Sequence, residues 1–250
     1  MLKQAVGKKH FGVSLGEEWF CSPECFECGA QKTILELLAT RKAQERTAAP
    51  RMPLGLSLLS RGALTDEQLK TALEQQRETG MNIGEVLEKL GFATPQQVTA
   101  AVAAQWGCPV FSLGERPTPA QLRIPRQLME MYSMMPVHYS DIGRKVMVGF
   151  VNRVEHQLLY TIEGITDCTA TPCFISSTDY RRALHSLDLS EKNEVVFDRA
   201  CSTLEIARTI RSYVSQLGAE RVRIGACRDY LWARVIGRHE NDLLFRLESS

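Results

Sequence analysis

The sequence predicts a multidomain α+β protein, in which duplicated helical hairpins precede a small α/β subdomain and then a small helix-plus-antiparallel-sheet unit. Two observations lead to this prediction. The first half of the chain contains an internal repeat with helical periodicity, and the second half contains short runs in which apolar and polar residues alternate. The 250 residues suffice for two or three small domains, and a hydrophobic content of 44% suffices for packed cores.

The internal repeat aligns residues 54–76 with residues 83–105 at a constant offset of 29 residues. So many matches at one offset indicate a duplicated structural unit. The matching positions are Gly55 with Gly84, Leu58 with Leu87, Gly62 with Gly91, Leu69 with Val98, Leu73 with Val102 and Gln76 with Gln105.

Each copy of the repeat predicts a short helix, a turn and a longer helix. Gly62 and Gly91 are expected where the short helix ends and a positive φ is useful. A capping box then predicts the start of the longer helix in each copy: Thr65 with Gln68, and Thr94 with Gln97. Taken alone, this pattern also fits a pair of packed helical hairpins with no ligand, and that alternative stays open.

The repeat forms the first half, residues 50–112, of a domain predicted over residues 50–187. Residues 113–187 predict the α/β half, since strand and helix patterns alternate there. Strands are expected at 134–140, at 145–151 and within 167–176, and helices at 153–164, at 177–187 and from Pro125.

The regions on either side of this domain have different sequence patterns. Residues 1–30 are rich in Gly and Cys, and residues 31–49 predict a helix that runs into a polar tether. Residues 188–199 are charged and aperiodic, which predicts a linker. Residues 200–250 predict a small α+β unit, with a capped helix from Ser202 to Gly218 and three antiparallel strands.

One face of that predicted sheet carries basic and aromatic residues. It could be a ligand surface or an ordinary solvated sheet face, and the pattern favours the solvated face. Its residues are Arg221, Arg223, Trp232, Arg234 and Arg246.

A cysteine cluster near the start of the chain is a candidate zinc site. Cys21, Cys25 and Cys28 lie close together, and His10 lies upstream. Thiolate and imidazole ligands suit tetrahedral zinc, although the spacing is not a standard ligand set. Free thiols in a mobile segment are the alternative.

Composition excludes several classes of protein. The net charge of +1 gives no electrostatic attraction to nucleic acid. No apolar run approaches the roughly 20 residues that span a bilayer, so we expect no membrane insertion, and the basic N-terminus lacks the apolar stretch of a signal peptide. These observations predict a cytoplasmic protein. No catalytic set emerges from the scattered histidines, so we expect a protein that is not an enzyme.

The repeat resembles the N-terminal domain of the ATPases of type II secretion and type IV pilus systems, often called the GspE/PulE N-terminal or MshEN domain. The signature of this family is two copies of Arg-Leu-Gly-x-x-Leu-Leu-x-x-Gly…Leu-x-x-x-Leu-x-x-Gln. The resemblance covers roughly residues 50–187, and residues 200–250 resemble the segment that precedes the motor. No GxxxxGK[ST] loop occurs in the sequence, so no ATP or Mg²⁺ site is expected.

The resemblance implies that the repeat binds cyclic di-GMP and that the partners are secretion or pilus assembly proteins. The glycines would let a ligand approach the backbone, the apolar residues would form a floor for purine faces, and the glutamine amides would hydrogen-bond base edges. The expected ligand-binding residues are Arg51, Leu54, Gly55, Leu58, Gly62, Leu69, Leu73, Gln76, Ile83, Gly84, Leu87, Gly91, Val98, Val102 and Gln105.

Three positions depart from the family pattern. The arginine that precedes Leu-Gly is replaced by Pro53 in the first copy and by Asn82 in the second, with Arg51 two residues upstream. The Asp-Pro that follows the second strand of the α/β half is Asn152-Arg153. The loss of charged hydrogen bonds predicts weaker binding, at a cost of about 1.5–3 kcal/mol each. A ligand-free adaptor that docks on a secretion or pilus ATPase, or on its platform, is therefore the alternative function.

Overall fold

The computed structural model describes residues 11–44, 51–114, 119, 122–187, 194–199 and 201–247. The chain folds as two compact units. Unit 1 joins Met1–Arg46 to Glu191–Ser250, and unit 2 is Thr47–Ser190, so unit 2 is inserted into the sequence of unit 1. Helices together with two sheets confirm the predicted α+β class.

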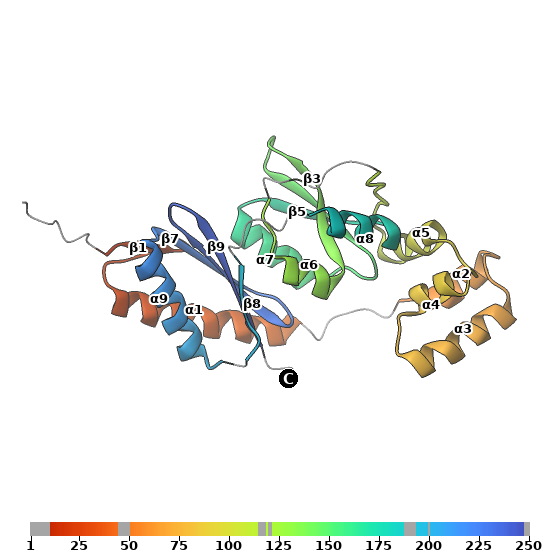
Figure 1. The fold of residues 1–250 in the computed structure, drawn as a ribbon, viewed down its shortest axis with the longest axis horizontal. Helices are drawn as coiled ribbons and strands as arrows, with labels where there is room; N and C mark the ends of the chain where they lie inside the picture. The colour runs from red at the N-terminus through yellow and green to blue at the C-terminus, as the bar shows by residue number, and fades with distance from the viewer. Residues whose placement is uncertain are drawn as a thin grey trace, which may run out of the picture. The chain divides into compact units, whose positions relative to one another are not determined.

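The duplicated motif forms four helices, as predicted (Figure 1). Each copy contributes a short helix and a longer one. Both predicted capping boxes are formed, since each threonine hydroxyl accepts the N–H of its glutamine and each glutamine side chain accepts the threonine N–H. The helices are α2 (Leu54–Ser60), α3 (Asp66–Thr79), α4 (Ile83–Lys89) and α5 (Pro95–Trp106).

The turns after the short helices use the two predicted glycines. Gly62 and Gly91 have φ values of 67° and 70°, a region that favours glycine. The Gly62 N–H donates to Leu59 O and the Gly91 N–H to Glu88 O, so the last carbonyls of α2 and α4 are satisfied.

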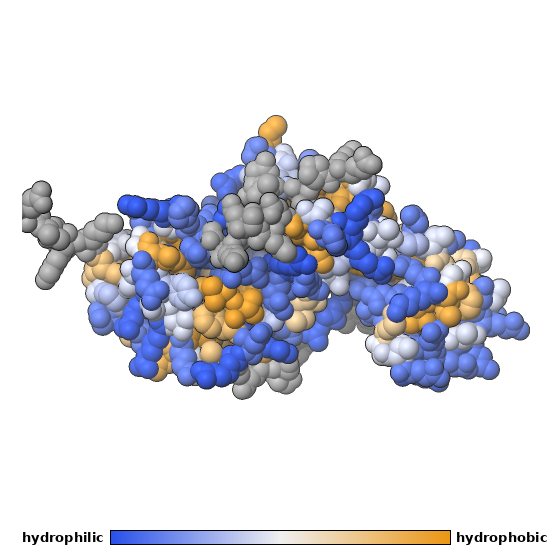
Figure 2. Space-filling view, viewed as in Figure 1, coloured by the Kyte–Doolittle hydropathy of each residue, from blue (hydrophilic) through white to orange (hydrophobic). Residues whose placement is uncertain are grey.

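The two copies interlock in one core. The short helix of each copy packs on the long helix of the other, α2 on α5 and α4 on α3. Leu58 and Leu87 occupy equivalent places and are 1% and 0% exposed. Hydrophobic residues also lie at the surface over α2 and α4 (Figure 2), where Leu56 is among the exposed apolar side chains.

In the residues that the structure describes, the α/β half of unit 2 contains a three-stranded sheet and three helices. Strand β3 pairs antiparallel with β4, and β4 pairs parallel with β5. The predicted strands and helices are confirmed, with bounds that shift by a few residues. They are α6 (Arg126–Tyr132), β3 (Met134–Ser140), β4 (Lys145–Phe150), α7 (His156–Thr166), β5 (Thr169–Phe174) and α8 (Ser177–Ser186).

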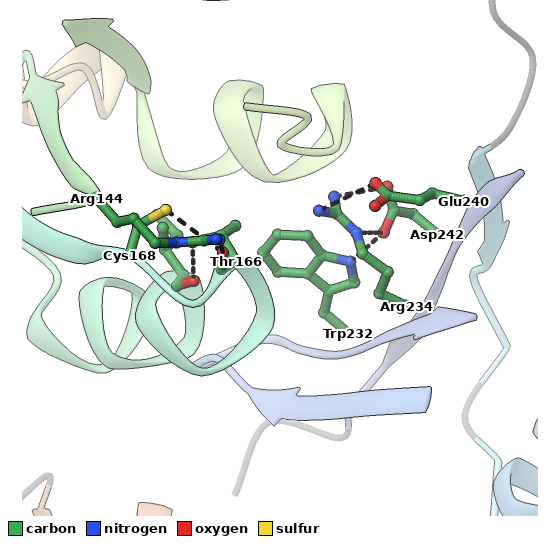
Figure 3. A network of polar contacts seen from close by, with 8 residues as sticks. Arg144, Thr166, Cys168, Trp232, Arg234, Glu240 and Asp242 are labelled. Atoms are coloured by element: carbon green, nitrogen blue, oxygen red, sulfur yellow. Dashed lines mark hydrogen bonds and ion pairs between the residues drawn. The ribbon is translucent and has the colours of Figure 1, made fainter. Parts of the chain in front are cut away.

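Arg144 secures the end of α7 within this half. Its Nε donates to Asp167 O at 2.8 Å and its Nη2 to Thr166 O at 2.9 Å (Figure 3). A cation at the C-terminal end of a helix satisfies free carbonyls and interacts favourably with the helix dipole. This contact fixes the turn that leads from α7 into β5.

The described part of unit 1 is a six-stranded sheet with two helices on one face (Figure 1). Helices α1 and α9 pack on each other and bury side chains of the central strands. The strand order is β2-β1-β7-β8-β9-β6, in which β1 runs parallel to β7 and β6 parallel to β9. The elements are β1 (Val13–Leu15), β2 (Glu18–Phe20), α1 (Pro23–Gln44), β6 (Glu194–Phe197), α9 (Thr203–Leu217), β7 (Arg221–Ala226), β8 (Tyr230–Ile236) and β9 (Glu240–Arg246).

The structure corrects three expectations about the regions that flank unit 2. Residues 194–197, expected within a linker over 188–199, form strand β6, because Val195 and Phe197 pack against the core of unit 1. The described part of residues 1–30 is not a separate segment, since β1 pairs with β7. The helix expected from residue 31 begins at Pro23, because Phe26 and Ala30 join the same core.

The sequence favoured a solvated face on the side of the sheet opposite the helices. The structure corrects this expectation, because part of that face is buried. Trp232 and Arg234 are buried, and both bind the carboxylate of Asp242 (Figure 3). The Trp232 Nε1 donates to Asp242 Oδ1 at 2.7 Å, and Arg234 makes two bonds at 2.8 and 3.0 Å. The bidentate pair satisfies charges that would be costly to bury alone.

Within the described residues, no helix is both long and apolar enough to cross a membrane.

Candidate binding site in the duplicated motif

The expected site residues divide by burial into two groups. The buried group holds the interlocked helices together and consists of Gly55, Leu58, Leu69, Gly84, Leu87, Val98 and Val102. The group that reaches the surface, in part or fully, consists of Arg51, Leu54, Gly62, Leu73, Gln76, Ile83, Gly91 and Gln105. Much of the conspicuous motif therefore serves packing, and an apolar floor for a ligand is restricted to Leu54, Leu73 and Ile83.

Gly55 and Gly84 are explained by helix packing. A Cβ atom at Gly55 would lie 2.4 Å from Leu69 Cδ1, and one at Gly84 would lie 3.0 Å from Val98 Cγ1. Such close approach favours glycine, because a Cβ atom at either position would displace a packed side chain of a long helix. These two glycines thus face the long helices rather than an open surface.

The two glutamines form a reciprocal pair of contacts. Gln76 Nε2 donates to Met81 O at 3.2 Å, and Gln105 Nε2 donates to Met52 O. Met52 and Met81 are themselves separated by the repeat offset. Each amide therefore ties the end of one long helix to the residues that lead into a short helix, and the two contacts are related by the pseudo-two-fold of the repeat.

Arg51 stacks on Trp106, the last residue of α5. The Arg51 Cζ atom lies 3.5 Å from the centroid of the indole ring, which is a cation–π arrangement. Trp106 is half-buried, and its ring centroid lies 6.2 Å from that of His156 and 6.4 Å from that of Phe174. Sequence reasoning missed Trp106 and His156, although an aromatic residue directly after Gln105 was a usable signal.

Two thiols lie in the same neighbourhood. Burial raises the pKa of Cys108 above its usual value, against a lowering effect of the Arg51 charge. Burial, with a smaller contribution from Cys108, raises the pKa of Cys173 to about 12. Both groups are therefore neutral thiols near pH 7, as expected of cysteines that pack rather than react.

The positions that depart from the family pattern are exposed, except for the half-buried Asn152. Pro53 and Asn82 are the N-cap residues of α2 and α4, and neither side chain makes a capping hydrogen bond. Asn152 is half-buried, and Arg153 pairs with Glu155 at 2.6 Å. Substitutions at residues 53 and 82 would therefore disturb few contacts.

The candidate zinc ligands are only partly within the described residues. Cys21, Cys25 and Cys28 are exposed free thiols around the start of α1, and His10 lies outside the described residues. Among the residues that the structure describes, no group of three or more His, Cys, Asp or Glu side chains is arranged to hold a metal ion. Zinc binding stays a prediction.

The chain resembles known proteins over about half of its length. No family model matches the chain. The chain is 27% identical over 133 residues to the type IV pilus assembly ATPase PilB of Thermus thermophilus. The match spans 52% of this chain and 15% of PilB, so this chain corresponds to a small part of that protein.

Two solved structures are also similar. MshE with cdg is 19% identical and covers 54% of this chain and 98% of its own, with a TM-score of 0.43. The N-terminal domain of XpsE is 15% identical and covers 56% of this chain and 97% of its own, with a TM-score of 0.43. The sequence match to PilB confirms that about half of this chain resembles part of a type IV pilus assembly ATPase.

Proposed function

We propose that this chain is a non-catalytic regulatory protein of a secretion or pilus system that binds cyclic di-GMP across its duplicated motif. The observation that supports this proposal is the reciprocal arrangement of the two copies. Helices α2 and α5 pair as α4 and α3 do, and Gln76 and Gln105 make equivalent backbone contacts. A two-fold dinucleotide would meet equivalent groups on such a surface.

The groups that remain at the surface suit a purine nucleotide. Arg51 provides a planar cation for a base face or a phosphate. Leu54, Leu73 and Ile83 provide apolar area. Each glutamine amide has a second N–H and a carbonyl oxygen for base edges beyond its backbone contact.

The alternative is a ligand-free adaptor for a secretion or pilus ATPase or its platform. The observation that favours it is the burial of much of the motif, since packing alone accounts for the residues at the buried positions. The replacement of both motif arginines by Pro53 and Asn82 favours it as well.

Isothermal titration with cyclic di-GMP, with GTP and ATP as controls, tests whether the chain is a receptor for cyclic di-GMP. We expect saturable binding of cyclic di-GMP alone. Gln76→Ala is not a clean test, since it also removes the bond to Met81 O, so its melting temperature must be measured beside its affinity.

Restoring the family arginine gives a sharper test. Asn82→Arg should tighten binding about tenfold, because one charged, bidentate contact contributes about 1.5–3 kcal/mol, part of which is lost to ordering of the side chain. Asn82→Gln is the matched control and should leave the affinity unchanged. No saturable heat for the wild type or for Asn82→Arg would sink the receptor and leave the adaptor, to be sought by pull-down of secretion or pilus proteins.

A further inference from the structure

The exposed thiols of the chain are concentrated at the start of α1. Cys21, Cys25 and Cys28 are exposed, whereas the other cysteines are buried or of intermediate exposure. Cysteine is among the residue types most often buried, because its side chain packs like a small apolar group. Packing therefore does not account for the thiols at the start of α1.

The two residues between Cys25 and Cys28 hold this part of the helix in place. Phe26 is fully buried in the core of unit 1. The Glu27 carboxylate pairs with two arginines of α9, at 3.1 and 3.0 Å. Because these side chains face the core and α9, Cys25 and Cys28 project from the opposite side of the helix into solvent. The fold of unit 1, rather than a flexible loop, therefore sets the spacing of the two thiols.

That spacing suits a metal ion better than a disulfide. Residues at i and i+3 of a helix have Cβ atoms about 5–6 Å apart. A disulfide brings its Cβ atoms to about 3.5–4.5 Å, so oxidation of Cys25 and Cys28 would distort the start of α1. Two metal–sulfur bonds of about 2.3 Å each span up to about 4.6 Å between the sulfur atoms. A metal ion can thus bridge the two thiolates while the helix keeps its geometry.

Two thiolates on one helix face form a ligand set for a soft ion of low coordination number. Structural zinc takes four protein ligands, whereas Cu(I) is a soft ion that forms two-coordinate complexes with thiolates. A complex of two thiolates with a monovalent ion carries a net negative charge. The N-terminal end of a helix favours such a charge, and Cys25 lies in the first turn of α1.

We infer that Cys25 and Cys28 form a two-thiolate site for a soft, thiophilic metal ion. Each thiol gives its proton to solvent as its sulfur coordinates the ion. This site differs from the zinc site expected from the sequence, because it needs neither Cys21 nor His10. It is also independent of the proposed cyclic di-GMP site, since its residues belong to unit 1 and the duplicated motif belongs to unit 2.

The test is anaerobic titration of the reduced full chain with Cu(I), in competition with the chromophoric chelator bicinchoninate. Wild type should bind one ion per chain. Cys25→Ser and Cys28→Ser should each weaken binding by more than about a hundredfold, because loss of a ligand costs more than the 10–100-fold found for loss of an outer-shell partner. Cys201→Ser, at a thiol elsewhere in unit 1, is the matched control and should leave the affinity unchanged. Circular dichroism melting should show no loss of stability in the variants of the two exposed thiols.

Four outcomes would overturn the inference. Equal losses for Cys21→Ser and Cys25→Ser would indicate a cluster of three thiolates. Zinc binding that Cys21→Ser abolishes, in competition with a zinc indicator, would restore the site expected from the sequence. Half an ion per chain, with a dimer on size-exclusion chromatography, would place the ion between two copies of the chain. No Cu(I) binding, with rapid loss of two thiols to oxidised glutathione, would make the pair a disulfide instead. The proposed cyclic di-GMP site stands or falls separately, by its own titration.

Discussion

The two copies of the repeat share a sequence pattern and a helix arrangement but differ in what surrounds them. In the second copy, α5 packs on β5 and α8, and α4 is tied to α8 through the bond from Ser177 to Glu88. Val102 is 4% exposed, whereas Leu73, its counterpart in the first copy, is 40% exposed. The duplicated pattern therefore specifies the interlocked core but not which side chains of each copy stay exposed.

The largest expected loss of stability is at equivalent positions that are buried in both copies. Leu58→Ala and Leu87→Ala should each lower the free energy of unfolding by about 3 kcal/mol, because both side chains are fully buried and leave a cavity. Urea denaturation followed by circular dichroism measures both. A cost for Leu58→Ala far below that for Leu87→Ala would mean that the copies do not share one core.

A smaller loss of stability should differ between the two copies. Val102→Ala should cost about 2 kcal/mol, since the side chain is buried against the core, whereas Leu73→Ala should cost less than about 1 kcal/mol, since it is partly exposed. The same denaturation experiment compares them. Equal costs would contradict the difference in burial between the copies.

A single substitution removes the hydrogen bond between the second copy and α8. Ser177 Oγ donates to Glu88 Oε2 at 2.7 Å in a partly buried place, and Ser177→Ala should cost about 1.5 kcal/mol, as for a hydrogen bond to a charged group. Thr178→Ala, which removes a hydroxyl at the exposed neighbouring position, is the control. The melting temperatures should separate the two variants, and coincident melting would show that this bond contributes little.

The last expected loss of stability should again be equal in the two copies. Thr65→Ala and Thr94→Ala each remove one capping box and should each cost about 1 kcal/mol. Thr→Ser at the same positions keeps the hydroxyl and should restore most of the loss. Unequal losses under thermal denaturation would indicate that one cap is reinforced by its surroundings.

Much of the fold could be predicted because its signals are local. The capping boxes, the helix-ending glycines and the alternation of the C-terminal strands depend on residues close together in sequence, and all of them are found in the structure. Strands β1 and β6 were missed for the opposite reason. They have only three and four residues, so they have almost no periodicity of their own, and β2, the local partner of β1, is equally short. The other pairings of β1 and β6 are with β7 and β9, far away in sequence.

The candidate site was harder to predict than the fold. Burial separates Leu69 from Leu73, yet both are leucines of one helix stripe and look alike in the sequence. The contact of Arg51 with Trp106 joins residues more than fifty positions apart, and no local pattern announces it. A sequence motif therefore showed where two copies exist but not which of their residues reach the surface.

The insertion of unit 2 has a consequence for synthesis of the chain on the ribosome. The Ser14 N–H donates to the carbonyl of Glu220, so unit 1 cannot close until about two hundred residues have followed its first strand. At about 5–20 residues per second, the apolar side chains of Val13, Phe26 and Ile34 wait on the order of ten seconds or longer for their partners. Unit 2 is contiguous in sequence and is fully synthesised within that interval, so we expect a stage of synthesis in which the inserted unit is able to fold and its host is not.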